Sequence, residues 1–135
     1  MSVSWERLEP EIRGWIEALL EGIDAYVDQE TKAKIFEKCG RNCARKHTVA
    51  MFKKAWKETQ DLEKFVAVID ERMGAETQWQ LKGNELHISY NRCFCFLPAL
   101  KLVNTPSLCN CSPGWIKENL EMALNKPIEV ERLHS

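Results

Sequence analysis

The sequence predicts an α+β fold, in which N-terminal helices pack on a small antiparallel sheet and a C-terminal helix and strand follow. Two observations support this fold class. Apolar residues recur at three- and four-residue spacing through residues 5–74, which is typical of amphipathic helices. Over residues 76–133 a spacing of two appears, interrupted by one further helical stretch. No linker or repeat divides the sequence, so we expect a single domain over residues 1–135.

The first helix is predicted from one apolar stripe, and Pro10 is expected in its first turn, where a missing N–H costs nothing. Asp28 is a candidate N-cap for a second helix, which carries Cys39, Cys43 and His47 along one line. The stripe of the first helix consists of Trp5, Leu8, Ile12, Trp15, Ile16, Leu19, Leu20, Ile23 and Val27.

Two further helical patterns cover residues 51–56 and 62–69, and Gly74 supplies a C-terminal stop. Residues 77–81 and 86–90 then alternate between apolar and polar, which indicates a two-stranded hairpin. Lys82, Gly83 and Asn84 lie between the two strands. We expect the alternation to continue through residues 93–96, until Pro98 interrupts it.

A loop is expected over residues 99–108, before the last helix. Ser112 is the predicted N-cap of that helix and Pro113 its first residue. The helix should end near Asn125, and residues 128–132 alternate as a final strand. The residues that this helix is expected to direct inward are Trp115, Ile116, Leu120, Ala123 and Leu124.

Composition excludes several classes of function. The formal net charge is -1, so no basic excess predicts binding to nucleic acid. The N-terminus lacks the basic start and apolar run of a secretory signal. No stretch approaches the roughly 18 apolar residues that span a bilayer, so no membrane association is expected. We therefore expect a cytoplasmic protein, in which clustered cysteines more often bind metal or act in catalysis than form disulfides.

The most distinctive feature is a set of six cysteines in three close pairs: Cys39 and Cys43, Cys93 and Cys95, and Cys109 and Cys111. The first pair is four residues apart on a helix, so both thiols project from one face. The second pair shares one face of an extended segment, because side chains alternate there. The third pair precedes a helix N-terminus, whose partial positive charge favours the thiolate form.

If the three pairs converge, they supply enough soft ligands for a tetrahedral zinc site or an iron–sulfur cluster. Zinc is the preferred prediction, because it needs no assembly machinery and tolerates varied ligand spacing. Two alternatives stay open. Free cysteines are often buried as small apolar side chains, and six cysteines can also form disulfides, although the missing signal sequence disfavours the latter.

Other residues are candidates for catalysis or for ligand binding. Cys109 or Cys111 could act as a nucleophile at the helix terminus, with His47 as the only well-placed base. Arg92 and Trp115 are candidates for binding a cofactor or small molecule, Arg92 as an anion-binding group and Trp115 as an aromatic pocket wall. Whether the protein is an enzyme is left open by these residues.

Two more arginines, Arg41 and Arg45, lie beside the first cysteine pair. They are interpreted either as solvated surface residues or as groups that hold an anion or lower a thiol pKa. The solvated surface is the preferred interpretation of both.

Two segments carry a family resemblance: Leu108-Cys-Asn-Cys-Ser-Pro-Gly-Trp-Ile-Lys-Glu-Asn-Leu-Glu121 with Lys126-Pro-Ile-Glu-Val-Glu131, and Cys39-Gly-Arg-Asn-Cys-Ala44. The first resembles the C-terminal half of the 4-vinyl-reductase-type small-molecule-binding domain. The whole chain resembles small uncharacterised prokaryotic cysteine-rich proteins and is distantly similar to the aminothiazoline-carboxylate hydrolase family. The resemblance implies an α+β fold and a site for a small molecule or metal. It also implies a further Cys-x-Phe strand, which this sequence does not contain.

Three functions are therefore predicted in order of preference. The first is a small-molecule- or metal-binding module with a cysteine-lined site, with zinc as the expected metal. The second is a cysteine-dependent hydrolase-type enzyme, and the third is a thiol redox sensor. The five tryptophans and the amphipathic first helix also allow a homodimer.

Overall fold

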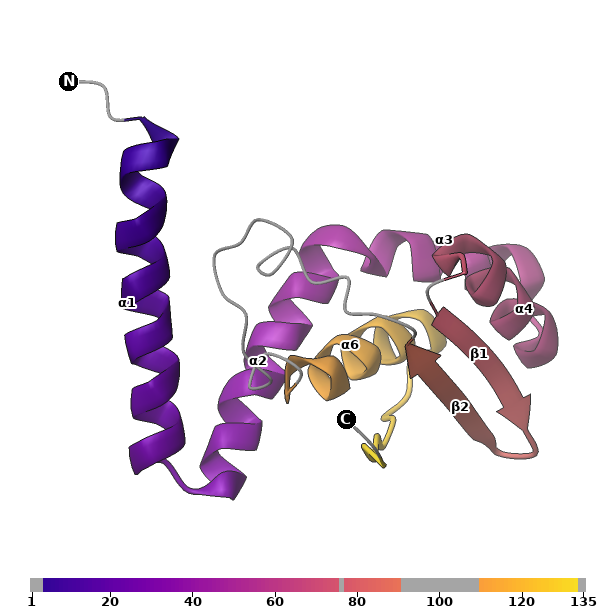
Figure 1. Ribbon diagram of the computed structural model, residues 1–135. Helices are drawn as coiled ribbons and strands as arrows, with labels where there is room; N and C mark the ends of the chain where they lie inside the picture. Colours follow the sequence, from indigo (N-terminus) through magenta and orange to yellow (C-terminus); the bar gives the residue numbers. More distant parts are fainter. Residues whose placement is uncertain (1–3, 76, 91–109, 134–135) are drawn as a thin grey trace.

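A computed structural model describes residues 4–75, 77–90 and 110–133 (Figure 1). Within these residues the α+β fold class is confirmed, with five helices and one antiparallel hairpin. In chain order the elements are α1 (Trp5–Tyr26), α2 (Gln29–His47), α3 (Val49–Thr59), α4 (Leu62–Met73), β1 (Thr77–Lys82), β2 (Glu85–Tyr90) and α6 (Ser112–Leu124).

Helix ends follow local signals in the sequence. The Asp28 carboxylate accepts a hydrogen bond of 2.8 Å from the Thr31 N–H, which confirms Asp28 as the N-cap of α2. Gly74 and Asn125 have φ values of 79° and 56° and end α4 and α6, as predicted. The placement of Pro10 was wrong: α1 begins at Trp5, so Pro10 lies inside the helix beyond its first turn.

The start of α6 also differs from the prediction by one residue. Cys111, not Ser112, is the N-cap, and its φ and ψ of -76° and -23° are already helical. A short 3₁₀ turn at residues 110–111 leads into the helix, so the chain enters it without the extended residue that a serine cap requires. Pro113 occupies the first turn as expected.

The predicted hairpin is formed, and its side chains alternate as expected. Thr77 pairs with Tyr90 and Trp79 with Ile88, while Gly83 adopts φ 64° in the turn, a conformation that favours glycine. Side chains on β1 alternate between buried and exposed from Thr77 onward. The strand expected at residues 93–96 and the loop expected at 99–108 lie outside the described residues.

The predicted terminal strand is not formed. Residues 127–133 contain neither helix nor strand. Ile128 and Val130 are nevertheless half-buried against the core, while Glu129 and Glu131 are exposed. The alternation in the sequence therefore indicates that alternate side chains face the core. Such burial does not require the backbone to pair with a neighbouring strand.

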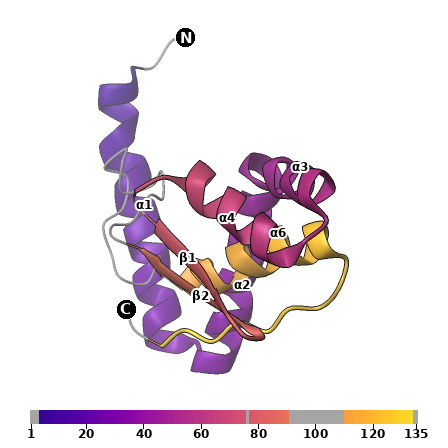
Figure 2. The ribbon, with the colours of Figure 1, turned by 90° about the vertical axis from the view of Figure 1, so that its right-hand side faces the viewer.

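The main core is centred on Phe52 of α3, which is fully buried. Its ring lies 6.3 Å from Phe65, 5.7 Å from Trp79 and 5.9 Å from Trp115, measured between ring centroids. These rings come from α4, β1 and α6, and the two strands lie side by side with β1 packed on α4 (Figure 2). One aromatic cluster therefore joins three helices to the hairpin.

A buried amide fixes α6 against the start of α3. Asn119 is fully buried, and its side chain accepts a 2.8 Å hydrogen bond from the Thr48 hydroxyl. It also donates a 3.0 Å hydrogen bond to the carbonyl of Trp115. Because both ends of the amide have partners, its burial carries no penalty for an unsatisfied polar group.

Helix α1 stands beside α2, away from the main core (Figure 1). Leu20 is its one buried residue, and it packs with Phe36 of α2 in a separate small cluster. Ile12, Ile16 and Ile23 border that cluster. Among the described residues no helix is long and apolar enough to cross a membrane.

Candidate functional site

Two glycines allow α2 and α6 to pack with their backbones in contact. A Cβ added to Gly40 would lie 2.0 Å from the carbonyl oxygen of Cys111 and 2.7 Å from the nitrogen of Trp115. A Cβ added to Gly114 would lie 2.1 Å from the carbonyl oxygen of Glu37. Only glycine fits at such distances, so this pair of residues sets the helix separation and places Cys111 directly against α2.

The contact brings together cysteines that are far apart in the sequence. Cys39, Gly40, Cys43 and Cys111 are among the many residues that line one broad hollow, which also extends along α4, the hairpin and residues 126–133. Cys39 is exposed, whereas Cys43 and Cys111 are half-buried. The structure thus brings a member of the third predicted pair to the helix turn that carries the first pair.

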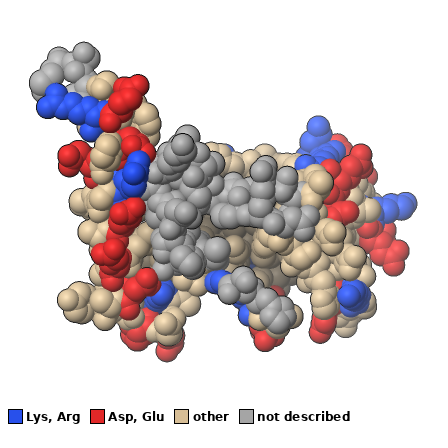
Figure 3. Space-filling view, viewed as in Figure 1, with Lys and Arg blue, Asp and Glu red and all other residues tan. Residues whose placement is uncertain are grey.

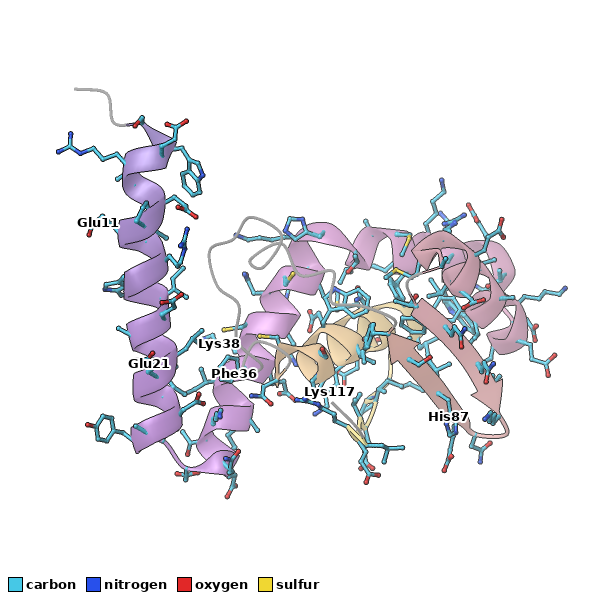
Figure 4. All side chains as sticks on the ribbon, viewed as in Figure 1. Glu11, Glu21, Phe36, Lys38, His87 and Lys117 are labelled. Carbon is cyan, nitrogen blue, oxygen red and sulfur yellow. The ribbon has the colours of Figure 1, made fainter. Side chains whose placement is uncertain are left out.

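The two half-buried thiols have different apolar surroundings. Cys43 packs against the main core, and Cys111 packs against the small cluster of Leu20 and Phe36. Phe36 lies on the side of α2 near α1 (Figure 4). Burial raises the pKa of the Cys43 thiol, because its apolar surroundings disfavour the thiolate. Without a neighbouring cation Cys43 is therefore a neutral thiol at neutral pH.

The partners of Arg41 and Arg45 are acidic residues of α6, not the cysteines beside them in sequence. Arg41 donates hydrogen bonds of 2.8 Å to Glu118 and to Glu121, and Arg45 donates one of 2.8 Å to Glu118. Burial alone would lower the pKa of Arg41, but the bonds to Glu121 and Glu118 outweigh it and raise that pKa. The two arginines link α2 to α6. Arg45 is nevertheless 61% exposed, which agrees with the solvated surface expected from sequence, whereas Arg41 is 23% exposed and partly buried at the interface.

Two further bonds extend this network. Lys117 of α6, labelled in Figure 4, binds Glu37 of α2 at 2.5 Å, and Glu37 is also the residue whose backbone lies against Gly114. Glu121 also accepts a 3.0 Å hydrogen bond from the Ile128 N–H, which holds the chain that leaves α6. The glycine contact is thus flanked by charged pairs along the same helix interface.

This network predicts a loss of stability in acid. The bond from Lys117 holds the pKa of Glu37 below its ordinary value. Burial raises the pKa of Glu121, but the bonds from Ile128 and Arg41 outweigh it, so that pKa is lowered too. Carboxyls with lowered pKa bind fewer protons in the folded state than when unfolded, so their stabilisation is present at neutral pH and is lost as the pH falls through their folded pKa.

We expect the free energy of unfolding, measured with urea, to fall between about pH 5 and pH 3. The variant Glu37→Gln should show a smaller fall over this range, because its side chain no longer titrates. Glu71→Gln, at an exposed position of α4, serves as the control and should keep the wild-type slope. Equal slopes in all three proteins would show that the α2–α6 network does not respond to pH.

The remaining predicted site residues fall into two groups. His47 is exposed and lines the same hollow as the three thiols, one turn beyond Cys43. Trp115 also borders the hollow, but most of its ring is buried in the core against Phe52 and Trp79. The residues that lie outside the described part of the chain are Arg92, Cys93, Cys95 and Cys109.

Within residues 4–75, 77–90 and 110–133, no three His, Cys, Asp or Glu side chains lie close enough together to hold a metal ion. The described thiols have the right chemistry for zinc, since thiolate is its preferred soft ligand. Their number and spacing do not complete a site. Donors from outside the described residues would be needed to complete one.

The residues that build the interface between α2 and α6 carry little signal in the sequence. Gly40 lies in the middle of a predicted helix, where glycine is unfavourable, and this was the one available signal of a close helix contact. Gly114 follows Pro113 near the start of a helix, and its position gave no signal of a close contact. Glu118 resembles any surface carboxylate in sequence, since only the fold reveals that it is buried.

Comparison with curated proteins and with solved structures finds no match to this chain. A family model described as a family of unknown function matches residues 6–135, which is nearly the whole sequence. The match includes all six cysteines and every described helix and strand except the first residue of α1. The chain therefore belongs to the family of unknown function DUF6144.

Proposed function

We propose that the protein is a metal-binding module whose cysteines bind Zn²⁺ where α2 meets the start of α6. One observation supports this proposal: the backbone of Cys111, a member of the third cysteine pair, lies against Gly40 in the turn of α2 that carries the first pair. A structural zinc site takes four ligands, often all cysteines. The described part of the chain offers three candidates, and Cys93, Cys95 and Cys109 are the candidates for the rest.

The protonation of Cys43 favours metal binding over direct thiol chemistry. A half-buried thiol with a raised pKa is a poor nucleophile and is slow to oxidise, because both reactions require thiolate. A metal cation supplies the charge that makes the thiolate favourable, and binding then releases a proton. Zinc affinity should accordingly increase with pH. The proposal also assumes a reducing cytoplasm, which keeps the thiols reduced.

The test is elemental analysis of protein purified without added metal. We expect stoichiometric zinc in the wild-type protein, and a loss of most of it in Cys43→Ser and in Cys111→Ser. Asn42→Ser, an exposed change on the same turn of α2, should keep the zinc and controls for the substitution itself. Circular dichroism checks that each variant is folded.

Other outcomes identify the alternatives. If the purified protein is brown and contains iron, the cysteines bind an iron–sulfur cluster and not zinc. Metal-free protein with one rapidly alkylated thiol would instead support the cysteine-dependent enzyme, with Cys109 or Cys111 as nucleophile and His47 as base. Metal-free protein whose thiols oxidise reversibly would support a redox sensor. If six unreactive thiols and no metal are found, the cysteines are structural and the proposal fails.

A further inference from the structure

Helix α1 exposes one side of its apolar stripe. Besides Trp5 at 50% in the first turn, four large side chains are exposed on it: Leu8 at 39%, Trp15 at 69%, Leu19 at 47% and Tyr26 at 90%. Their spacings of seven, four and seven residues place them on one face of the helix. The other side of the stripe, with Ile16, Leu20 and Ile23, packs on α2, and Ile12 lies at the border between the two sides, partly buried against the same cluster. One face therefore serves the contact with α2, and a second face is left without a partner among the described residues.

The contact with α2 alone is small for a helix of this length. Leu20 is the one buried residue of the 22 in α1. Most of the stability of a helix in a protein comes from packing of its apolar face, since isolated helices are marginal in water. Exposed aromatic and aliphatic side chains in a row are typical of an interaction surface.

The spacing along this face is symmetric. Adding Ile12 and Gly22 completes a seam with successive spacings of 4, 3, 4, 3 and 4 residues, which has its midpoint at position 17. A second copy of the helix can therefore pack antiparallel about a two-fold axis at that level. Leu8 would then face Tyr26 of the second copy, and Trp15 would face Leu19. Ile12 would face Gly22.

Gly22 is the one small residue of this seam. It lies inside α1, four residues before the helix ends at Tyr26, and glycine inside a helix costs about 1 kcal/mol relative to alanine. A Cβ added there would meet no atom within 4 Å, as is also the case at Gly14, so among the described residues neither position requires glycine for packing. In the antiparallel pair it is the small residue that receives the Ile12 side chain of the second copy.

The charges of α1 are compatible with a second copy and not with an anionic membrane. The helix carries six acidic and two basic residues, and acidic side chains line it (Figure 3). Glu17, Glu21 and Asp24 each follow a seam position by two residues, about 200° around the helix, so they face away from the seam. Glu11 lies nearer to it, but in the antiparallel arrangement it is level with Ile23 of the second copy and not with that copy's Glu11.

We propose that the protein forms a homodimer in which two α1 helices pack antiparallel through Leu8, Ile12, Trp15, Leu19, Gly22 and Tyr26. The acidic faces of both helices stay in water, and α2 with its cysteines lies on the outer flank of each α1. The interface is independent of the proposed metal site. It uses no cysteine and buries none of the residues that line the hollow.

Sedimentation velocity over a range of concentrations tests the proposal. The wild-type protein should have twice the 15.7 kDa chain mass. Leu8→Glu should raise the dimer dissociation constant by at least roughly tenfold, because an unpaired charge would be buried. Tyr26→Lys should do the same. Ala25→Glu adds the same charge on an exposed part of α1 outside the seam and should have little effect.

The double variant Leu8→Glu with Tyr26→Lys determines the orientation of the helices. In an antiparallel pair each introduced glutamate faces the introduced lysine of the other copy, so the double variant should dimerise better than either single variant. In a parallel pair like charges would meet and no rescue would occur, which would rule out the register proposed here. A wild-type protein that stays monomeric up to about 100 μM would overturn the dimer itself, whether or not zinc is bound.

Discussion

Replacing Gly40 with alanine is expected to lower the free energy of unfolding by roughly 3 kcal/mol. The new Cβ would lie 2.0 Å from the carbonyl oxygen of Cys111, and a backbone atom cannot turn aside as a flexible side chain does. Helices α2 and α6 must therefore separate. That movement also lengthens the hydrogen bonds from Arg41 and Arg45 to Glu118, so packing and charge pairing are lost together.

Gly14→Ala is the matched control for this substitution. Gly14 also lies inside a helix, but a Cβ there meets no atom within 4 Å, so we expect a gain of about 0.5–1 kcal/mol from helix propensity. Urea unfolding followed by circular dichroism measures both variants. If Gly40→Ala behaves like Gly14→Ala, the close approach of α2 and α6 is wrong. Zinc content of the Gly40→Ala protein then tests whether the metal site depends on this contact.

Phe52→Ala should destabilise the protein by about 3–5 kcal/mol, which is the usual cost of emptying a buried aromatic site. Phe52 is fully buried, and its ring contacts aromatic rings from α4, β1 and α6. Its removal leaves a cavity where three elements meet, and rigid neighbouring rings cannot fill it. Because Trp79 and Trp115 border the site, tryptophan fluorescence and circular dichroism should both report the change.

Leu62→Ala is the control for Phe52→Ala. Leu62 is 37% exposed at the start of α4, so its truncation should cost less than about 1 kcal/mol. The two losses are compared in the same guanidinium series. Equal effects would mean that Phe52 is not the centre of the core, and that the aromatic cluster does not join the helices to the hairpin.

Much of the local structure could be predicted because its causes are local. Asp28 and Asn125 act through the backbone next to them, so they mark helix ends in any fold. The hairpin follows from alternation and from Gly83, which suits the turn. The same reasoning failed at residues 128–132, since a half-buried segment alternates whether or not another strand pairs with it.

The candidate site depends on contacts that no local pattern contains. The sequence placed Cys39 and Cys43 on one helix face, but their approach to Cys111 depends on two glycines in different helices. Arg41 was interpreted from its neighbours in sequence, whereas its partner Glu118 is 77 residues away. Only three of the six cysteines lie in the described residues, so the convergence of all three pairs remains a prediction.

The distance along the chain between the two glycine-bearing helices has a consequence for biosynthesis. Helix α2 belongs to the first third of the protein, but its partner α6 is made almost last. Chains fold during synthesis from the N-terminus onward, and contacts between distant segments must wait for both to exist. The α2 cysteines therefore emerge from the ribosome long before Cys111 does. In a newly made chain the α2 cysteines lack Cys111 as a neighbour until the last helix is complete.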